Sequence, residues 1–172
     1  LGGRLAQCYL PYDLRCAVDR FFEKRRPLLG LVMETAVWPN LMAAAAARAR
    51  TSACSFVYTS GVWVLGSNAQ PMDETAQASP GQLLTWRPVH EQLVLQAAAP
   101  NLRTAVVRPG IVYGGNRGIV SDLLKNALNG LIRVIGTGDN HWPLIYDRDL
   151  ADLYVRVATL PDFLEMRYNR PC

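Results

Sequence analysis

The sequence has few of the side chains that bind metal ions or cross-link small domains. Its 172 residues include two histidines and four cysteines, the latter at positions 8, 16, 54 and 172. These positions form no Cys-x-x-Cys pair, so the spacing indicates neither a structural zinc site nor a redox motif. Asp147, Asp149 and Asp152 have the spacing of helix capping and of a solvated helix face rather than of a cation site. We therefore predict no metal, and free thiols of the kind found in cytoplasmic proteins.

Long apolar runs are also missing. The longest are Pro27–Met33 and Leu41–Ala47, which are far shorter than the roughly 20 residues that a membrane span requires. The first residue is Leu1, and no charged segment followed by an apolar one comes after it. We therefore expect a fragment or a trimmed chain rather than a secreted precursor. A chain of this length predicts one domain, with a core large enough to be stable without disulfides.

The net positive charge is concentrated at one end of the sequence. Residues 1–50 contain eight basic and four acidic side chains, whereas residues 51–172 contain ten of each. The basic cluster Arg20–Arg26 is the part that could contact nucleic acid, but no motif that reads nucleic acid accompanies it. A solvated helix face is the favoured interpretation, and nucleic-acid binding is the less favoured alternative.

The N-terminal segment, residues 1–39, is divergent, because three prolines interrupt it and neither helical nor strand periodicity is sustained. After it, Asn40 is expected to cap a helix over residues 41–50, which are rich in alanine. Cys54–Ser60 is short, β-branched and aromatic, which predicts a buried strand. Residues 66–81 are rich in turn-forming and polar residues and predict a long surface loop.

The middle of the chain predicts a strand–helix–strand unit. A helix with Pro88 in its first turn is expected within residues 85–99, and a second strand over Arg103–Arg108. Such a unit has parallel strands, so we predict an α/β fold with an open, doubly wound parallel sheet. Two more helices are expected, one over Ile119–Asn129 and one that begins at Asp147 or Asp149 and runs through Ala158.

The strand Cys54–Ser60 carries no charge, and an unpaired apolar strand associates readily with another chain. We therefore expect it to form an exposed sheet edge that allows self-association. The alternative is that residues 1–39 fold back and shield this edge. Apolar residues available for shielding are Val18, Phe21, Phe22, Leu28, Leu29, Leu31 and Val32.

Four segments form a recognisable pattern in order and spacing: Phe56–Gly66, Arg108–Gly114, Gly136–Pro143 and Ile145–Asp152. Together they resemble the extended short-chain dehydrogenases/reductases of the NAD-dependent epimerase/dehydratase family. The resemblance covers residues 40–160 and leaves 161–172 as a C-terminal tail. It implies the C-terminal half of a Rossmann-like, doubly wound parallel sheet, with part of a small substrate lobe. It also implies NAD or NADP as cofactor, a sugar nucleotide or similar small molecule as substrate, no membrane partner, and a cytoplasmic location.

The residues that carry the chemistry in this family are a Ser or Thr after the fifth strand and a Tyr-x-x-x-Lys pair on the following helix. The resemblance places these three positions on Gly61, Trp86 and His90, and none of them matches. Ser60, next to Gly61, supplies a hydroxyl, whereas the indole of Trp86 cannot relay a proton. His90 either contacts a ribose hydroxyl or acts as a base near neutral pH, or it simply packs beside Trp86. The positional candidates for catalysis are therefore His90, Trp86 and Ser60.

The cofactor contacts implied by the resemblance are Thr59, Ser60, His90, Pro109, Gly110, Ile111 and Val112. The glycine fingerprint G-x-x-G-x-x-G, which holds a pyrophosphate at a helix N-terminus, is absent from the sequence. Two functions remain open. One is an NAD(P)-dependent, epimerase/dehydratase-like oxidoreductase relative with a degenerate catalytic motif. The other is a truncated, non-catalytic pseudoenzyme that binds a small molecule or a protein partner.

Overall fold

The structure is a computed structural model that describes residues 9–33, 38–115, 117–134 and 136–159. Its centre is a parallel sheet of three strands with the order β1-β2-β3, and a second sheet pairs two further strands, also in parallel. The strands are β1 (Leu29–Val32), β2 (Cys54–Thr59), β3 (Leu102–Val107), β4 (Ile111–Tyr113) and β5 (Leu144–Tyr146). The parallel α/β architecture confirms the predicted fold class.

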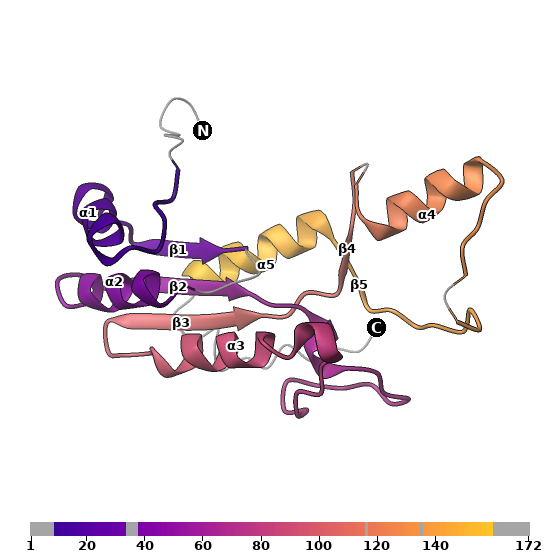
Figure 1. Ribbon diagram of the computed structural model, residues 1–172, viewed down its shortest axis with the longest axis horizontal. Helices are drawn as coiled ribbons and strands as arrows, with labels where there is room; N and C mark the ends of the chain where they lie inside the picture. Colours follow the sequence, from indigo (N-terminus) through magenta and orange to yellow (C-terminus); the bar gives the residue numbers. More distant parts are fainter. Residues whose placement is uncertain (1–8, 34–37, 116, 135, 160–172) are drawn as a thin grey trace.

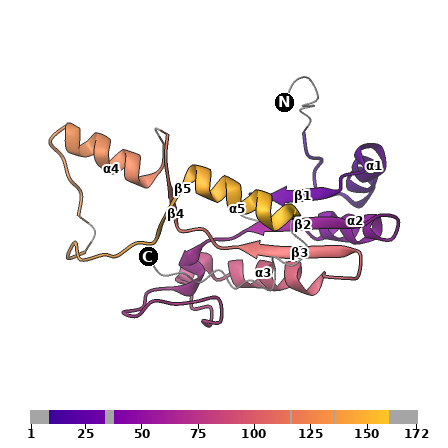
Figure 2. The same cartoon turned by 180° about the vertical axis from the view of Figure 1, so that it is seen from behind.

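Helices cover both faces of the three-stranded sheet. The α-helices of the described residues are α1 (Arg15–Arg25), α2 (Pro39–Ala49), α3 (Arg87–Gln96), α4 (Ile119–Leu128) and α5 (Asp147–Thr159). Helices α1, α2 and α3 lie toward one face, whereas α5 lies behind the sheet in Figure 1 and in front of it in Figure 2. Helix α4 stands apart from the sheet (Figure 1). Within the described ranges, no helix is both long and apolar enough to cross a bilayer.

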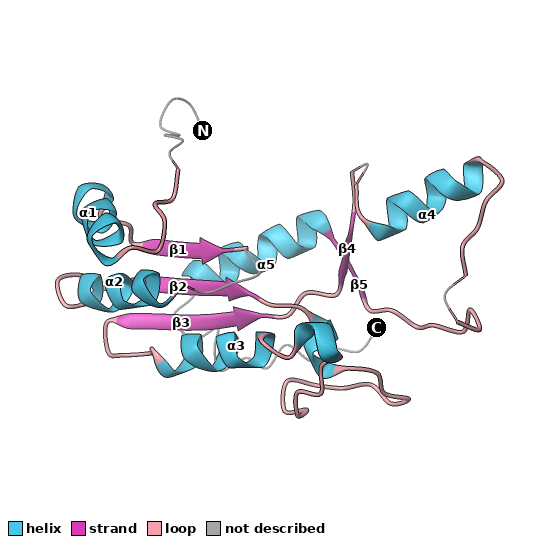
Figure 3. Ribbon diagram, viewed as in Figure 1, coloured by secondary structure: helices cyan, strands magenta, loops and turns pink. Residues whose placement is uncertain are grey.

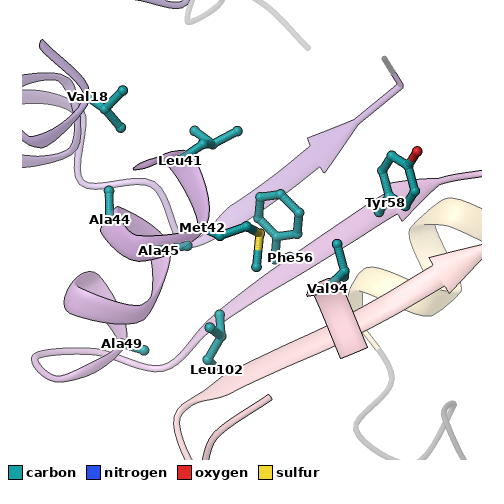
Figure 4. Close-up of a cluster of buried hydrophobic side chains, with 10 residues drawn as sticks. All are labelled: Val18, Leu41, Met42, Ala44, Ala45, Ala49, Phe56, Tyr58, Val94 and Leu102. Atoms are coloured by element: carbon teal, nitrogen blue, oxygen red, sulfur yellow. The ribbon is translucent and has the colours of Figure 1, made fainter. Parts of the chain in front are cut away.

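The central strand β2 is buried on both faces because its side chains alternate between two hydrophobic clusters. Phe56 and Tyr58 pack with residues of α2, α3 and β3 (Figure 4), whereas Val57 packs with Leu150 and Tyr154 of α5. Helix α2 contributes to the first cluster with Leu41, Met42, Ala44, Ala45 and Ala49. A strand that is covered on both sides is typical of parallel sheets.

The predicted exposed edge at Cys54–Ser60 is wrong. Strand β2 pairs with β1 from Leu29↔Ser55 to Val32↔Tyr58, and with β3 along its other side. The N-terminal segment therefore supplies a helix and a strand where the sequence showed no sustained period. A strand of four residues is too short to display a period, and its position depends on the neighbouring strand. The alternative, in which the N-terminal segment folds back and shields the edge, is the one seen in the described part of that segment, where Leu29–Val32 pairs with β2.

The predicted cap of α2 also differs. Trp38 occupies the N-cap position and Pro39 begins the helix, so Asn40 lies inside it. Asp13, which precedes α1, accepts hydrogen bonds from the backbone N–H groups of Asn40 (3.3 Å) and Leu41 (3.1 Å). A carboxylate at this position satisfies N–H groups that the helix leaves unpaired and interacts favourably with the helix dipole. The capping group is thus 27 residues away from Asn40 in sequence, which local patterns do not reveal.

The predicted loop and the later elements agree with the sequence to within a few residues. Residues 66–81 contain only turns and irregular backbone between two short 3₁₀ helices, Val62–Leu65 and Gln82–Leu84 (Figure 3). The last helix begins at Asp147, the first of the two predicted starts.

An ion pair joins α3 to the end of β3. The guanidinium of Arg108 donates from Nε to Glu91 Oε1 (3.1 Å) and from Nη2 to Glu91 Oε2 (2.6 Å). Glu91 is almost fully buried, so its negative charge is stabilised in the interior by the two hydrogen bonds from Arg108. The pair fixes the rotation of α3 about its own axis relative to the sheet.

A hydrogen bond joins the other face of the sheet to α5. The hydroxyl groups of Thr59 and Tyr154 are 2.6 Å apart. Burial raises the pKa of Tyr154, and this hydrogen bond partly opposes the shift. Burial also raises the pKa of Tyr58, which lies near the charges of Arg87 and Glu91.

Replacing Glu91 by Gln is expected to lower the free energy of unfolding by at least about 2 kcal/mol. The positive charge of Arg108, which is mostly buried, would then have no carboxylate to balance it. Urea denaturation measures the effect. The control is Asp19→Asn, which breaks the exposed Arg15–Asp19 pair (3.0 Å) and should change stability by less than about 0.5 kcal/mol. Equal losses in the two variants would contradict the role given to the Glu91–Arg108 pair.

Stability is expected to fall as the pH rises above 10. The unfolded chain releases the protons of Tyr58 and Tyr154 near the ordinary pKa of 10.0, whereas the folded chain retains them because both pKa values are raised. The contribution is therefore fully present below pH 10 and is lost above it. Denaturation measured below and above pH 10 should show a smaller decrease in the free energy of unfolding for Tyr154→Phe than for the unchanged chain. The exposed Tyr12→Phe serves as control, and an identical decrease in all three proteins would refute the explanation.

Candidate functional site

A pocket of about 400 Å³ opens where β2 and β3 end. Its walls come from Ser60–Trp63 after β2, from Pro109–Val112 after β3, from Leu84 in the 3₁₀ helix before α3, from Arg87 at the start of α3, and from the start of α4. In open parallel sheets, ligands bind outside the carboxyl ends of the strands. The position of this pocket therefore fits a functional site.

A wider cavity of about 610 Å³ lies between α1 and α2. It is lined largely by long polar side chains on the surfaces of these two helices, among them Arg15 and Asp19, which pair with each other. It is remote from the carboxyl ends of the strands. We therefore place the candidate site at the smaller pocket.

One glycine, Gly110, allows the pocket wall to form, and another, Gly61, marks where Arg87 lies. A Cβ atom at Gly110 would lie 2.5 Å from the carbonyl oxygen of Pro143, so the backbone before β5 could not approach as it does. The same carbonyl accepts a hydrogen bond from the N–H of Ile111 (2.8 Å). At Gly61, a Cβ atom would lie 3.6 Å from Nη1 of Arg87. The guanidinium thus lies directly over the backbone that follows β2.

Arg87 enters the pocket because of its place on α3. It lies one helical turn before Glu91, on the same face of the helix, and this face is held toward the sheet by the Glu91–Arg108 pair. The guanidinium carbon lies 4.9 Å from the ring centroid of Trp86, within the range of a cation–π contact. The Nε atom of Arg87 is buried and has no hydrogen-bond partner in the described structure.

Two hydroxyl groups close to this point are buried and have no hydrogen-bond partner in the described parts of the chain. They belong to Ser60, which is 6% exposed and lines the pocket, and to Tyr58, which is fully buried on β2. A buried hydroxyl without a partner is unfavourable by about 1–3 kcal/mol. Such groups are uncommon in folded proteins, and a bound ligand is one way in which they are satisfied.

The structure brings together most of the predicted cofactor contacts. Ser60, Pro109, Gly110, Ile111 and Val112 line the one pocket. Thr59 is different, because its hydroxyl bonds to Tyr154 on the opposite face of the sheet. The side chain of a strand residue points to the face opposite that of its neighbour, so Thr59 and Ser60 cannot serve the same pocket.

Trp86 and His90 form a ring pair on α3, with centroids 5.1 Å apart. The indole Nε1 of Trp86 donates to the carbonyl oxygen of Leu83 (3.0 Å). Neither ring is part of the pocket lining, which at this place is made by Arg87. Sequence reasoning missed Arg87. Its position could have been inferred from the spacing of four residues between Arg87 and Glu91, which places both on one face of the helix. Arg108, at the end of the next strand, is the partner that could hold this face toward the sheet.

The helices that follow β1 and β2 do not fit the pyrophosphate of a dinucleotide. Such a group binds at the N-terminus of a helix that follows a strand. Helix α2 begins with Pro39, which has no N–H group, and its next two N–H groups bond to the carboxylate of Asp13. Helix α3 also has a proline, Pro88, in its first turn. No cluster of three or more His, Cys, Asp or Glu side chains that could hold a metal ion exists in the described ranges.

Comparison with known proteins gives two different results for the two ends of the chain. Residues 1–55 match the model of the 3-deoxy-D-manno-octulosonic-acid transferase (kdotransferase) family. A 3-deoxy-D-manno-octulosonic acid transferase of Bordetella pertussis is 52% identical over 46 residues, which are 27% of this chain and 11% of that protein. The chain thus spans about a tenth of this relative's length.

Solved structures resemble a longer part of the chain. The UDP-glucose 4-epimerase of Thermus thermophilus, in complex with NAD, has a TM-score of 0.64 at 17% identity, over 86% of this chain and 58% of that one. The UDP-glucuronic acid 4-epimerase of Bacillus cereus, in complex with UDP-glucuronic acid and NAD, has a TM-score of 0.66 at 14% identity, over 84% and 52%. The chain therefore spans little more than half of each, and the likeness shows a shared fold.

The family itself follows from a match that covers most of the sequence. Residues 31–169 match the model of the NAD-dependent epimerase/dehydratase family. This range includes all four segments that resemble the family. It begins at the third residue of β1 and contains α2 and every later strand and helix of the described structure. The chain belongs to the NAD-dependent epimerase/dehydratase family.

Proposed function

We propose that this chain binds the sugar end of a sugar nucleotide in the pocket at the carboxyl ends of β2 and β3, and does so without turnover of its own. The observation that carries the proposal is the Ser60 hydroxyl, which is buried at the pocket and lacks a partner in the described structure. A hydroxyl on a bound sugar would satisfy it. Membership of the family and the sugar nucleotide named for a similar structure, UDP-glucuronic acid, support this choice of ligand.

Binding without turnover is the better supported alternative because the proton-relaying groups of the family are replaced. Trp86 stands at the place of the tyrosine, and its N–H already bonds to Leu83. Ser60 and His90 remain the proposed candidates if a longer form of the protein turns over substrate. In that case His90 takes the ribose contact or the role of base, which is testable with His90→Ala and His90→Gln.

The N-terminal segment has a proposed origin of its own. The two family matches overlap over residues 31–55, a range that contains α2 between the end of β1 and the start of β2. Residues 1–30, which precede this overlap, match the transferase family alone and correspond to part of a glycosyltransferase-like unit that is joined to the rest of the chain. We place the proposed change of ancestry within this overlap, which includes the proposed boundary at residue 39.

UDP-glucose is expected to bind the chain, and Gly110→Ala is expected to weaken binding at least about tenfold. The added methyl group would collide with the carbonyl of Pro143, so the pocket wall or the start of β5 must move. Isothermal titration calorimetry measures the affinity. The control is Gly81→Ala, because no atom lies within 4 Å of the added group. Absence of binding by the unchanged chain would contradict the proposed function.

NAD(H) and NADP(H) are expected to bind weakly or not at all. The helix N-termini that follow β1 and β2 carry prolines, and the first of them is also capped by Asp13, so no site there replaces the pyrophosphate cradle. Titration of the chain with each cofactor tests this. An affinity in the micromolar range for either one would show that the cofactor is held in another way.

A further inference from the structure

The described wall of the pocket contains one charged side chain and no charge of opposite sign. Among its lining residues, Arg87 is the one ionisable group, and the others are small, apolar or neutral. The acid nearest to it along α3, Glu91, already forms two hydrogen bonds with Arg108. The salt bridges of the described residues do not include Arg87. A positive charge therefore faces the pocket without compensation.

This charge is held in place before any ligand arrives. The Glu91–Arg108 pair fixes the rotation of α3, and the guanidinium of Arg87 rests on the ring of Trp86 with Nη1 over Gly61. A side chain that is already ordered loses little conformational entropy when it binds a ligand. Arg87 is thus prepared to bind an anion rather than free to move into solvent.

Independent observations point to a polar ligand at the same place. Nε of Arg87 and Oγ of Ser60 are both buried and have no partner in the described structure. Ser60 also lines the pocket together with Gly118 and Ile119 at the N-terminus of α4. The positive end of this ten-residue helix adds to the potential of Arg87. An anionic group with a neighbouring hydroxyl would satisfy all of these features.

We propose that the pocket selects a sugar that carries a carboxylate, as in a uronic acid, and that Arg87 is the residue that determines this specificity. The inference rests on the proposed function and narrows its substrate class. One guanidinium with a planar pair of donors matches one carboxylate. The mainly apolar remainder of the wall suits the carbon skeleton of a sugar ring rather than a second anionic group.

Two probes that differ only at one carbon test this. UDP-glucuronic acid and UDP-glucose have the same nucleotide and the same diphosphate, so the carboxylate is the single difference. Titration calorimetry on the full chain should give an affinity about ten- to a hundredfold higher for UDP-glucuronic acid, as expected for a hydrogen bond between charged groups. Arg87→Gln should abolish the preference, and Arg87→Lys should retain part of it.

The matched control is Arg50→Gln. It removes the same charge from an exposed position after α2, near the opposite end of the sheet from the pocket, and should leave the preference unchanged. Urea denaturation of each variant verifies that the fold is retained. A preference that survives Arg87→Gln, or is lost equally in Arg50→Gln, overturns the proposal.

The remaining outcomes separate this inference from the proposed function. Equal affinity of the unchanged chain for both nucleotides would overturn the acidic specificity and leave sugar-nucleotide binding standing. If neither nucleotide binds, the proposed function fails, and free glucuronate with glucose as its neutral control decides the inference. Glucuronate binding that depends on Arg87 supports the anion site, and its absence overturns it.

Discussion

The structure depends on one constraint: a central parallel strand needs a hydrogen-bonded neighbour on each side and a packed layer on each face. Strand β2 meets all four requirements, with β1 and β3 beside it, α2 and α3 on one face, and α5 on the other. The pocket exists because β2 and β3 end side by side in this arrangement, which places Ser60 next to Pro109. Ser60 and Arg87 are positioned through this strand and through α3, which packs on it.

The longer elements after residue 40 could be predicted because each has a local signal, whereas the three-residue strands β4 and β5 were not predicted. The strand Cys54–Thr59 has an apolar, β-branched sequence, and α3 has a proline in its first turn. The elements before residue 40 could not be predicted in the same way. Strand β1 is defined by its pairing with β2, and the cap of α2 is Asp13, far away in sequence. Both depend on contacts that form only after the chain has folded.

The candidate site could also be predicted in part from the sequence. The resemblance to the family located Ser60 and the segment after β3, because these follow strands directly. It also directed attention to Trp86 and His90, whereas the pocket is lined by Arg87 between them. Which of these three side chains enters the pocket depends on the rotation of α3, and that rotation is fixed by the contact between Glu91 and Arg108. A contact between a helix and a distant strand end is not visible in the spacing of residues within the helix.

The small side chains of α2 have a consequence for how such a chain can arise. Three of the five residues that α2 contributes to its core cluster, Ala44, Ala45 and Ala49, have short side chains, whereas Leu41 and Met42 are the two large ones. Pairing between β1 and β2 uses backbone groups, which every sequence provides. Recombination between genes of different families can therefore preserve a folded sheet at this point, provided that the register of the strands is kept.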